Sequence, residues 1–237
     1  MRSCMAFFKR RLSKIHNKHH PSDFVCRLKK SLYGLKQAPR AWNERFTSFL
    51  PSLGFQASST DPSLFIQHSL LDTVVLLLYV DDIILTGSNS SLITSIISAL
   101  TQEVDMKDLG QLTYFLGLQI LYQSADLFVS QTKYIKELLD KVDLQDSKPC
   151  STPCLPYHRL LKDDGKPYSH LEQYRSIVGA LQYLTFTRPD IAFSVNQACQ
   201  FMHNPMESHV VAVKRILRYL KSTIDFGIWL SPSSARL

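Results

Sequence analysis

The stretch Thr73-Val-Val-Leu-Leu-Leu-Tyr-Val-Asp-Asp-Ile-Ile-Leu-Thr-Gly87 decides the fold. Residues 73–80 and 83–86 are rich in β-branched and aliphatic side chains, and Asp81 and Asp82 separate the two runs. This pattern predicts a β-hairpin with two carboxylates at its tip. Adjacent carboxylates repel each other, and a divalent cation such as Mg²⁺, which prefers oxygen ligands, relieves the repulsion. Aspartate also suits ordinary turns, so the pattern alone leaves both readings open.

The rest of the chain alternates between helical periodicity and strand-like runs. We expect helices at about 39–53, 90–103, 132–142, 174–186, 191–202 and 208–222, and strands at 63–67, 112–121, 127–130 and 226–230. Gly54 is expected to end the first helix, Ser90 or Ser91 to cap the second, and residues 124–126 to turn a second hairpin. The proline-containing stretch 151–170 has the composition of a linker.

The composition is that of a globular protein. The chain has 237 residues, of which 45% are hydrophobic and 20% charged, which excludes wholesale disorder and low-complexity architectures. Its longest apolar run, Val74–Val80, is too short to cross a membrane. The five cysteines are sparse and no secretory segment precedes them, so we expect an intracellular protein, cytoplasmic or nuclear, without a disulfide framework.

Positive charge is concentrated at the N-terminal end. Residues 1–45 hold twelve Lys and Arg against two acidic residues, within a total net charge of +7. A segment this cationic favours a polyanion such as nucleic acid. For residues 1–20, which contain no acid and no hydrophobic periodicity, a solvated disordered tail is the favoured interpretation, with a transit peptide as the other alternative.

Two motifs carry a resemblance to a known family. Tyr79-Val-Asp-Asp82 between two apolar strands resembles the YxDD box of reverse transcriptases. About forty residues earlier stands Val25-Cys-Arg-Leu-Lys-Lys-Ser-Leu-Tyr-Gly-Leu-Lys-Gln-Ala-Pro-Arg-Ala-Trp42, which resembles the signature of Ty1/copia-type retrotransposon polymerases. Several shorter segments resemble the same family: Met106–Gly110, Tyr114–Gly117, Ser130–Tyr134, Ser151–Pro153, Tyr174–Gly179 and Thr187–Ile191. Together, the resemblance covers about residues 24–230.

The resemblance implies an α/β polymerase palm, an antiparallel sheet with packed helices, followed by thumb-like and helical connection segments, with the N-terminal fingers missing. The expected organisation is a basic disordered segment at 1–23, a partial palm at 24–125, a thumb-like hairpin strand and helix at 126–150, a linker at 151–170 and a helical connection segment at 171–237. The partners it implies are an RNA or DNA template-primer and deoxynucleotides, without a membrane.

The resemblance also implies roles for individual residues. Asp81 would bind catalytic Mg²⁺ with Asp82 as its weaker partner, and Tyr33 and Gly34 would meet the incoming nucleotide. Further nucleic-acid contacts are implied for the residues Lys36, Arg40, Phe115, Leu116 and Gly117. Two non-functional alternatives stay open. Lys36 and Arg40 can be solvated cations, and residues 115–117 can belong to an ordinary buried strand. Lys107, a candidate general acid toward pyrophosphate, is better explained as a surface lysine.

One departure from the family pattern bears on activity. The third metal-binding carboxylate comes, in this family, from an earlier strand of the form Asp-Val-x-x-Ala-Phe, and no such strand is recognisable here; Asp23, the only acid before Tyr33, lies in a polar stretch. The chain ends at Leu237, where the family would continue into a ribonuclease H segment, so we expect a polyprotein fragment with little polymerase activity alone. The alternatives are a neighbouring chain that supplies the carboxylate, a nucleic-acid-binding remnant without catalysis, and a non-functional relic with an unpaired sheet edge.

A zinc site is the weakest of the candidate constellations. Cys150, Cys154 and His158 are evenly spaced, but no fourth ligand is evident and two prolines interrupt the run. We therefore expect no zinc.

Overall fold

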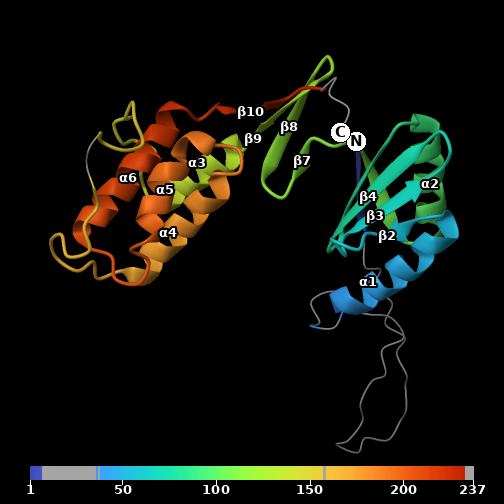
Figure 1. Ribbon diagram of the computed structural model, residues 1–237, viewed down its shortest axis with the longest axis horizontal. Helices are drawn as coiled ribbons and strands as arrows, with labels where there is room; N and C mark the ends of the chain where they lie inside the picture. Colours follow the sequence, from blue (N-terminus) through green and yellow to red (C-terminus); the bar gives the residue numbers. More distant parts are fainter. Residues whose placement is uncertain (7–35, 37, 157–158, 233–237) are drawn as a thin grey trace, which may run out of the picture. The chain divides into compact units, whose positions relative to one another are not determined.

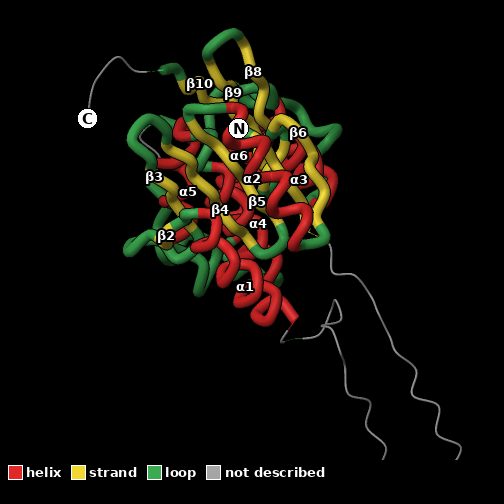
Figure 2. Tube along the Cα trace, turned by 90° about the vertical axis from the view of Figure 1, so that its right-hand side faces the viewer, coloured by secondary structure: helices red, strands yellow, loops and turns green. Residues whose placement is uncertain are grey.

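The computed structural model describes residues 1–6, 36, 38–156 and 159–232. The chain forms two compact units, Met1–Leu112 (unit 1) and Thr113–Leu237 (unit 2). Each has its own sheet and its own buried core (Figure 1). Along the chain, helices lie between the strands of unit 1, whereas in unit 2 three strands come first, the helices follow, and a fourth strand comes last. Figure 2 shows the helices, strands and loops in separate colours. The architecture is mixed α/β with antiparallel pairing, as the sequence predicts.

Unit 1 is built on a six-stranded sheet in the order β2-β3-β4-β5-β1-β6. Its strands are β1 (Arg2–Ala6), β2 (Gln56–Ala57), β3 (Leu64–His68), β4 (Thr73–Tyr79), β5 (Asp82–Gly87) and β6 (Met106–Gln111). Along β4 the side chains alternate strictly between buried and half-buried, because successive residues of a strand point to opposite faces. The predicted hairpin at residues 73–86 is therefore confirmed.

Helices cover one face of this sheet. They are α1 (Ala38–Phe49), continued by the 3₁₀ turn η1 (Leu50–Leu53), and α2 (Ser90–Glu103). Phe46 and Leu50 from the first helix and Ile93, Ile97 and Leu100 from the second pack against the buried strand residues. Gly54 ends the first helix with φ of +83°, as expected for a glycine cap. The second helix is capped by the Asn89 side chain, which accepts from the amides of Ser91 and Leu92, and not by a serine.

The N-terminal strand corrects the expectation of a disordered segment at 1–23. Strand β1 pairs antiparallel with β5 on one side and with β6 on the other. The edge of β5 that does not pair with β4 is therefore hydrogen-bonded to β1. Strand β6 was not predicted either, since its polar sequence shows little β pattern. Both strands depend on partners distant in the sequence, and local propensity alone cannot detect such partners. The remainder of the N-terminal segment lies outside the described residues.

Unit 2 contains a four-stranded sheet in the order β10-β9-β8-β7. The strands are β7 (Tyr114–Phe115), β8 (Leu118–Gln123), β9 (Asp126–Ser130) and β10 (Gly227–Leu230). The expected single strand at 112–121 is instead broken by a turn at Leu116-Gly117, where φ is positive at both residues. The second predicted hairpin, through Ser124 and Ala125, is confirmed by the pairing of Gln123 with Asp126.

The helices of unit 2 enclose the second core. They are α3 (Thr132–Lys141), α4 (Leu171–Leu184), α5 (Ala192–Cys199), preceded by the 3₁₀ turn η2 (Pro189–Ile191), and α6 (Glu207–Ser222). Each predicted helix is present within a few residues of its expected bounds. Val178, Leu181, Val195, Ile216 and Leu220 are fully or almost fully buried in this core. No helix in the described parts of the chain is long and apolar enough to span a membrane.

The stretch 151–170, expected to be a linker, lies inside unit 2. Its backbone is held to the start of α6: the Glu207 amide donates to the Lys166 carbonyl at 2.9 Å, and the Ser208 hydroxyl donates to the Asp164 carbonyl at 2.7 Å. The buried His209 side chain lies 2.8 Å from the Leu161 carbonyl oxygen through Nε2. The boundary between the two compact units falls earlier, between Leu112 and Thr113.

Candidate active site

The two aspartates lie where strands β4 and β5 join. Val80 and Asp81 form a two-residue turn, and Asp82 is the first residue of β5, paired across the hairpin with Tyr79. The buried residues of β4 and β5, such as Leu78 and Ile83, face the helices. Since residues directly opposite share a face, Asp82 and Tyr79 lie on the other face of the sheet. Both carboxylates are half-buried.

The turn is backbone-strained. Val80 adopts φ of +54°, a left-handed conformation that β-branched residues rarely take and that costs about 1–2 kcal/mol. Its side chain is 53% exposed, so core packing does not compensate for the strain. A glycine or asparagine would suit this position better if the only requirement were to reverse the chain. Such strain at a conspicuous polar turn is a mark of functional sites.

Negative charge at the hairpin is not compensated by a cation among the described residues. Burial raises the pKa of Asp82, and the neighbouring Asp81 carboxylate raises it further. Both effects disfavour the charged form of Asp82. A divalent cation placed at the two carboxylates would offset both by stabilising the charged form.

The donor chemistry fits Mg²⁺, which is commonly held by one or two carboxylates together with substrate phosphate oxygens. The described residues offer no group of three or more His, Cys, Asp or Glu side chains that could hold a metal ion. Strand β1, which pairs with β5 so that Met5 stands opposite Asp82, consists of Arg, Ser, Cys, Met and Ala. The strand beside the two aspartates therefore brings no third carboxylate.

Only some of the residues predicted to contact the nucleotide and the template are among those that the structure describes. Tyr33 and Gly34 lie outside the described residues, as does Asp23. Lys36 is exposed. Arg40 lies in the first turn of α1, where its Nε donates to Glu44 at 2.8 Å, and both side chains are largely exposed. An exposed ion pair of this kind is weak, so Arg40 remains available to a phosphate.

The residues predicted to grip the primer form the β7–β8 hairpin of unit 2. Phe115 ends β7, and Leu116 and Gly117 make the turn. Both turn residues have positive φ, as in the two-residue turns that commonly join antiparallel strands. The Leu116 side chain is exposed. The Leu116 carbonyl accepts a hydrogen bond from the Tyr183 hydroxyl of α4. Phe115 thus lies in a strand, whereas Leu116 and Gly117 lie in the turn. Contact of the three residues with nucleic acid stays a prediction.

Sequence reasoning missed the side chains that fix this hairpin. Tyr183 packs edge-on against Tyr134 with ring centroids 5.3 Å apart, and the Gln119 side chain accepts from the Lys133 amide at 2.9 Å. The Lys133 ammonium lies 5.6 Å from the Tyr114 ring centroid. An aromatic residue at an exposed helix position, such as Tyr183, was the available signal.

The structure describes three of the four lesser candidates. Cys150 and Cys154 are free thiols, and His158 lies outside the described residues. Lys107 is exposed on β6.

Comparison with known proteins adds a second line of observation. The family model described as "Reverse transcriptase (RNA-dependent DNA polymerase)" matches residues 11–156. The Retrovirus-related Pol polyprotein from transposon RE1 of Arabidopsis thaliana is 44% identical over 208 residues, covering 88% of this chain and 14% of that polyprotein. The corresponding polyprotein from transposon TNT 1-94 of Nicotiana tabacum is 40% identical over 209 residues, covering 84% of this chain and 16% of its own length.

A shorter relative is also similar. An uncharacterized mitochondrial protein of Arabidopsis thaliana is 48% identical over 159 residues, which cover 67% of this chain and 66% of that protein. The chain thus spans 14% to 16% of the two Pol polyproteins it matches. No solved structure gives a significant match.

Proposed function

Because the chain belongs to the reverse transcriptase (RNA-dependent DNA polymerase) family and is a partial Ty1/copia-type member of it, we propose that it is a segment of an RNA-directed DNA polymerase whose Asp81 and Asp82 serve nucleotidyl transfer. The β4–β5 hairpin carries this proposal: two half-buried carboxylates on a strained turn, with the pKa of Asp82 raised by burial and by Asp81. In this proposal unit 1 is a partial palm.

The chemistry follows from the position of the two carboxylates. In nucleotidyl transfer the 3′-hydroxyl of a primer attacks the α-phosphorus of a deoxynucleotide, and pyrophosphate leaves. Bound Mg²⁺ would supply charge stabilisation for the attacking and leaving oxygens. Asp81, at the tip, and Asp82, anchored by its pairing in β5, would hold the ion on a rigid scaffold. Rigid positioning matters because preorganised charges need no rearrangement during the reaction.

The remaining contacts belong to nucleic-acid binding. We assign Tyr33 and Gly34 to the incoming nucleotide, Lys36 and Arg40 to phosphates, and the Phe115–Gly117 hairpin to the primer end. The docking of that hairpin through the Leu116 carbonyl supports the last assignment, because a hairpin held at its turn presents its exposed side chains in a fixed place.

A second candidate function, binding of template-primer without catalysis, is favoured by one observation. Strand β1 occupies the position beside β5 but contains no acidic residue. Loss of one electrostatic contribution to the transition state commonly lowers the rate by about 10²–10³-fold. We therefore expect this chain alone to bind template-primer and to extend it poorly or not at all.

Primer extension on an RNA template with Mg²⁺ tests the proposal. The purified chain is compared with Asp81→Asn and with Asp140→Asn, which removes an exposed carboxylate from α3 as a matched control. Template binding is measured in parallel over a series of salt concentrations. The expected result is salt-sensitive binding in all three proteins, because phosphate contacts release counterions, with no extension by any of them.

Three outcomes are informative. Extension that disappears only in Asp81→Asn would refute the expected inactivity while supporting the role of Asp81. Extension that survives in Asp81→Asn would refute that role. Absence of template binding at low salt would refute both candidate functions. A second readout is independent of activity: Mg²⁺ should raise the unfolding temperature of the wild-type chain and of Asp140→Asn more than that of Asp81→Asn.

A further inference from the structure

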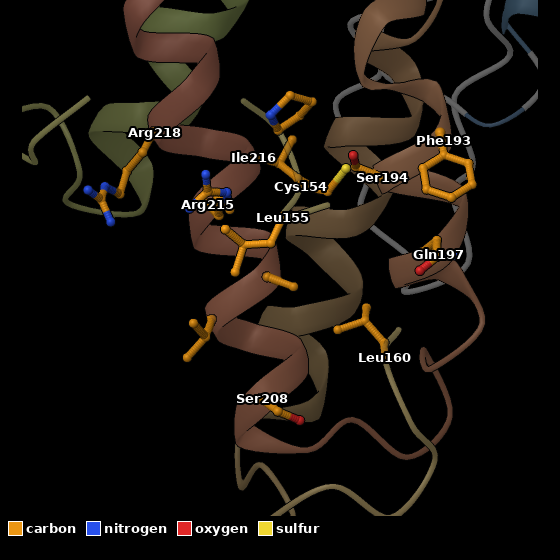
Figure 3. A pocket seen from close by; sticks show the side chains of 13 residues that line it. Cys154, Leu155, Leu160, Phe193, Ser194, Gln197, Ser208, Arg215, Ile216 and Arg218 are labelled. Atoms are coloured by element: carbon orange, nitrogen blue, oxygen red, sulfur yellow. The ribbon is translucent and has the colours of Figure 1, made fainter. Parts of the chain in front are cut away.

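Unit 2 contains a cavity of about 180 Å³ between residues 153–155 and 160 on one side and helices α5 and α6 on the other (Figure 3). Its lining includes none of the residues assigned above to nucleotidyl transfer or nucleic-acid binding. The volume is close to that of an engineered apolar cavity of about 150 Å³ that binds benzene. The space therefore fits an apolar group about the size of one aromatic ring.

Three large apolar side chains of the cavity lining are unusually exposed. Phe193 is 67% exposed, Val211 68% and Leu155 49%, and all three line the cavity. Leu160 adds a fourth apolar side chain. Large apolar side chains gathered around a concave site and left in water are typical of ligand sites.

Two buried polar atoms in the lining lack partners among the described residues. The Ser194 side chain, 6% exposed, has no hydrogen-bond partner for its Oγ. Arg215 donates from Nη2 to Thr152 at 2.8 Å, but its buried Nε has no acceptor. A buried polar atom without a partner destabilises the folded protein. Both atoms have almost no accessible surface, so a group in the cavity would reach them only after neighbouring side chains shift.

The charged residues of the lining favour an anionic ligand. Its charged residues are Arg215 and Arg218, and no acidic residue is among them. Arg218 donates from Nε to the Lys148 carbonyl at 2.5 Å and extends away from the other labelled side chains in Figure 3. Arg215 is therefore the cation available to a ligand. Its planar guanidinium matches a carboxylate, with two oxygens, better than a neutral acceptor.

We propose that this cavity binds a small monocarboxylate whose apolar body is the size of one aromatic ring. The ring lies against Phe193, Leu155 and Leu160, and the carboxylate accepts from the Arg215 guanidinium. This is a binding site separate from the proposed polymerase function and does not depend on it.

The free thiols provide a built-in assay. Cys154 lines the cavity, whereas Cys150 does not, and both are free and half-buried. The probe is 3-phenylpropionate, and the neutral comparison is 3-phenylpropionamide. Alkylation of each thiol by iodoacetamide is followed in the full chain by mass spectrometry with fragment-ion localisation. At a probe concentration about ten times the dissociation constant, the rate at Cys154 should fall about tenfold with no change at Cys150.

Variants separate the charge from the apolar contact. Arg215→Met should weaken protection by 3-phenylpropionate about tenfold and abolish its advantage over the amide, since a hydrogen bond to a charged group is worth about one factor of ten or more. Lys214→Met, the preceding residue on α6 and not part of the lining, should change nothing. Phe193→Ala, at an exposed position, should weaken both probes alike.

Three results would overturn the proposal. They are equal protection of Cys150 and Cys154, protection of Cys154 that is unchanged in Arg215→Met, and no protection by saturating concentrations of either probe. Helical circular dichroism of each variant checks that the fold is retained, and the Phe193→Ala variant tests the same site if Arg215→Met does not fold.

Discussion

Replacement of Arg188 by methionine is expected to destabilise unit 2 by about 3 kcal/mol. Arg188 is fully buried, although it is charged. Its guanidinium donates to both carboxylate oxygens of Asp190, at 2.9 and 2.7 Å, and to the carbonyl and hydroxyl oxygens of Thr223, at 2.8 and 2.6 Å. It thereby ties the turn after α4 to the end of α6.

The magnitude follows from what the substitution leaves behind. Methionine fills a similar volume, but Asp190 keeps its charge and retains the hydrogen bonds from the Tyr219 hydroxyl, at 2.8 Å, and from its own backbone amide. Breaking a buried ion pair by removing one partner costs about 3–5 kcal/mol. Because the Asp190 side chain is 34% exposed, water solvates part of the freed charge, and we expect the lower end of that range.

Urea unfolding measures the effect. The chain has two tryptophans, Trp42 in unit 1 and Trp229 in unit 2, so a Trp42→Phe background leaves a fluorescence signal from unit 2 alone. With a denaturant slope of about 2 kcal/mol per molar, the midpoint should fall by about 1.5 M. Arg175→Met is the matched control: this exposed arginine also bonds to a carbonyl, that of Met202, and its loss should cost at most about 1 kcal/mol.

A double-mutant cycle tests the cause. If the unpaired carboxylate accounts for the loss, Arg188→Met combined with Asp190→Asn should be more stable than the sum of the two single effects by about 1–2 kcal/mol. A loss below about 1 kcal/mol in Arg188→Met, or strict additivity in the cycle, would refute this account of the network.

Three further predictions follow from single residues. Burial raises the pKa of Asp190, but hydrogen bonds from Arg188 and Tyr219 and the Arg188 charge outweigh it, so its folded pKa lies below the ordinary value. The pair should therefore stabilise unit 2 above about pH 4 and lose this effect as the pH falls through the folded pKa, and urea midpoints should depend less on acid in Asp190→Asn. Gly227→Ala should destabilise unit 2 by about 1–3 kcal/mol because an added Cβ would lie 2.3 Å from the Val129 carbonyl oxygen; an unchanged midpoint by Trp229 fluorescence would contradict this. Leu85→Ala, in the fully buried centre of β5, should destabilise unit 1 by about 2–5 kcal/mol, measured by Trp42 fluorescence in a Trp229→Phe background, and an effect on unit 2 instead would show that the units do not unfold separately.

Local patterns in the sequence were sufficient for most helices and for the β4–β5 hairpin. The alternation of Thr73–Tyr79, the interruption by Asp81 and Asp82, and the apolar stripes of α2 and α6 all arise from side chains a few residues apart. Helix and strand periodicity are properties of a single segment, so they can be recognised without a partner. The family resemblance rests on motifs of the same local kind.

Only the tertiary structure decided which distant segments meet. Strand β1 has a weak β pattern of its own and is defined by hydrogen bonds to β5 and β6, about 80 and 105 residues away. The stretch 151–170 looks like a linker but bonds to α6, and Arg188 looks like a surface cation but is buried on Asp190 and Thr223. The unpartnered atoms of Ser194 and Arg215 likewise become visible only where α5, α6 and residues 153–155 and 160 line a cavity. Burial and strand pairing depend on contacts between residues far apart in the chain. The residues next to a given position in the sequence do not indicate these contacts.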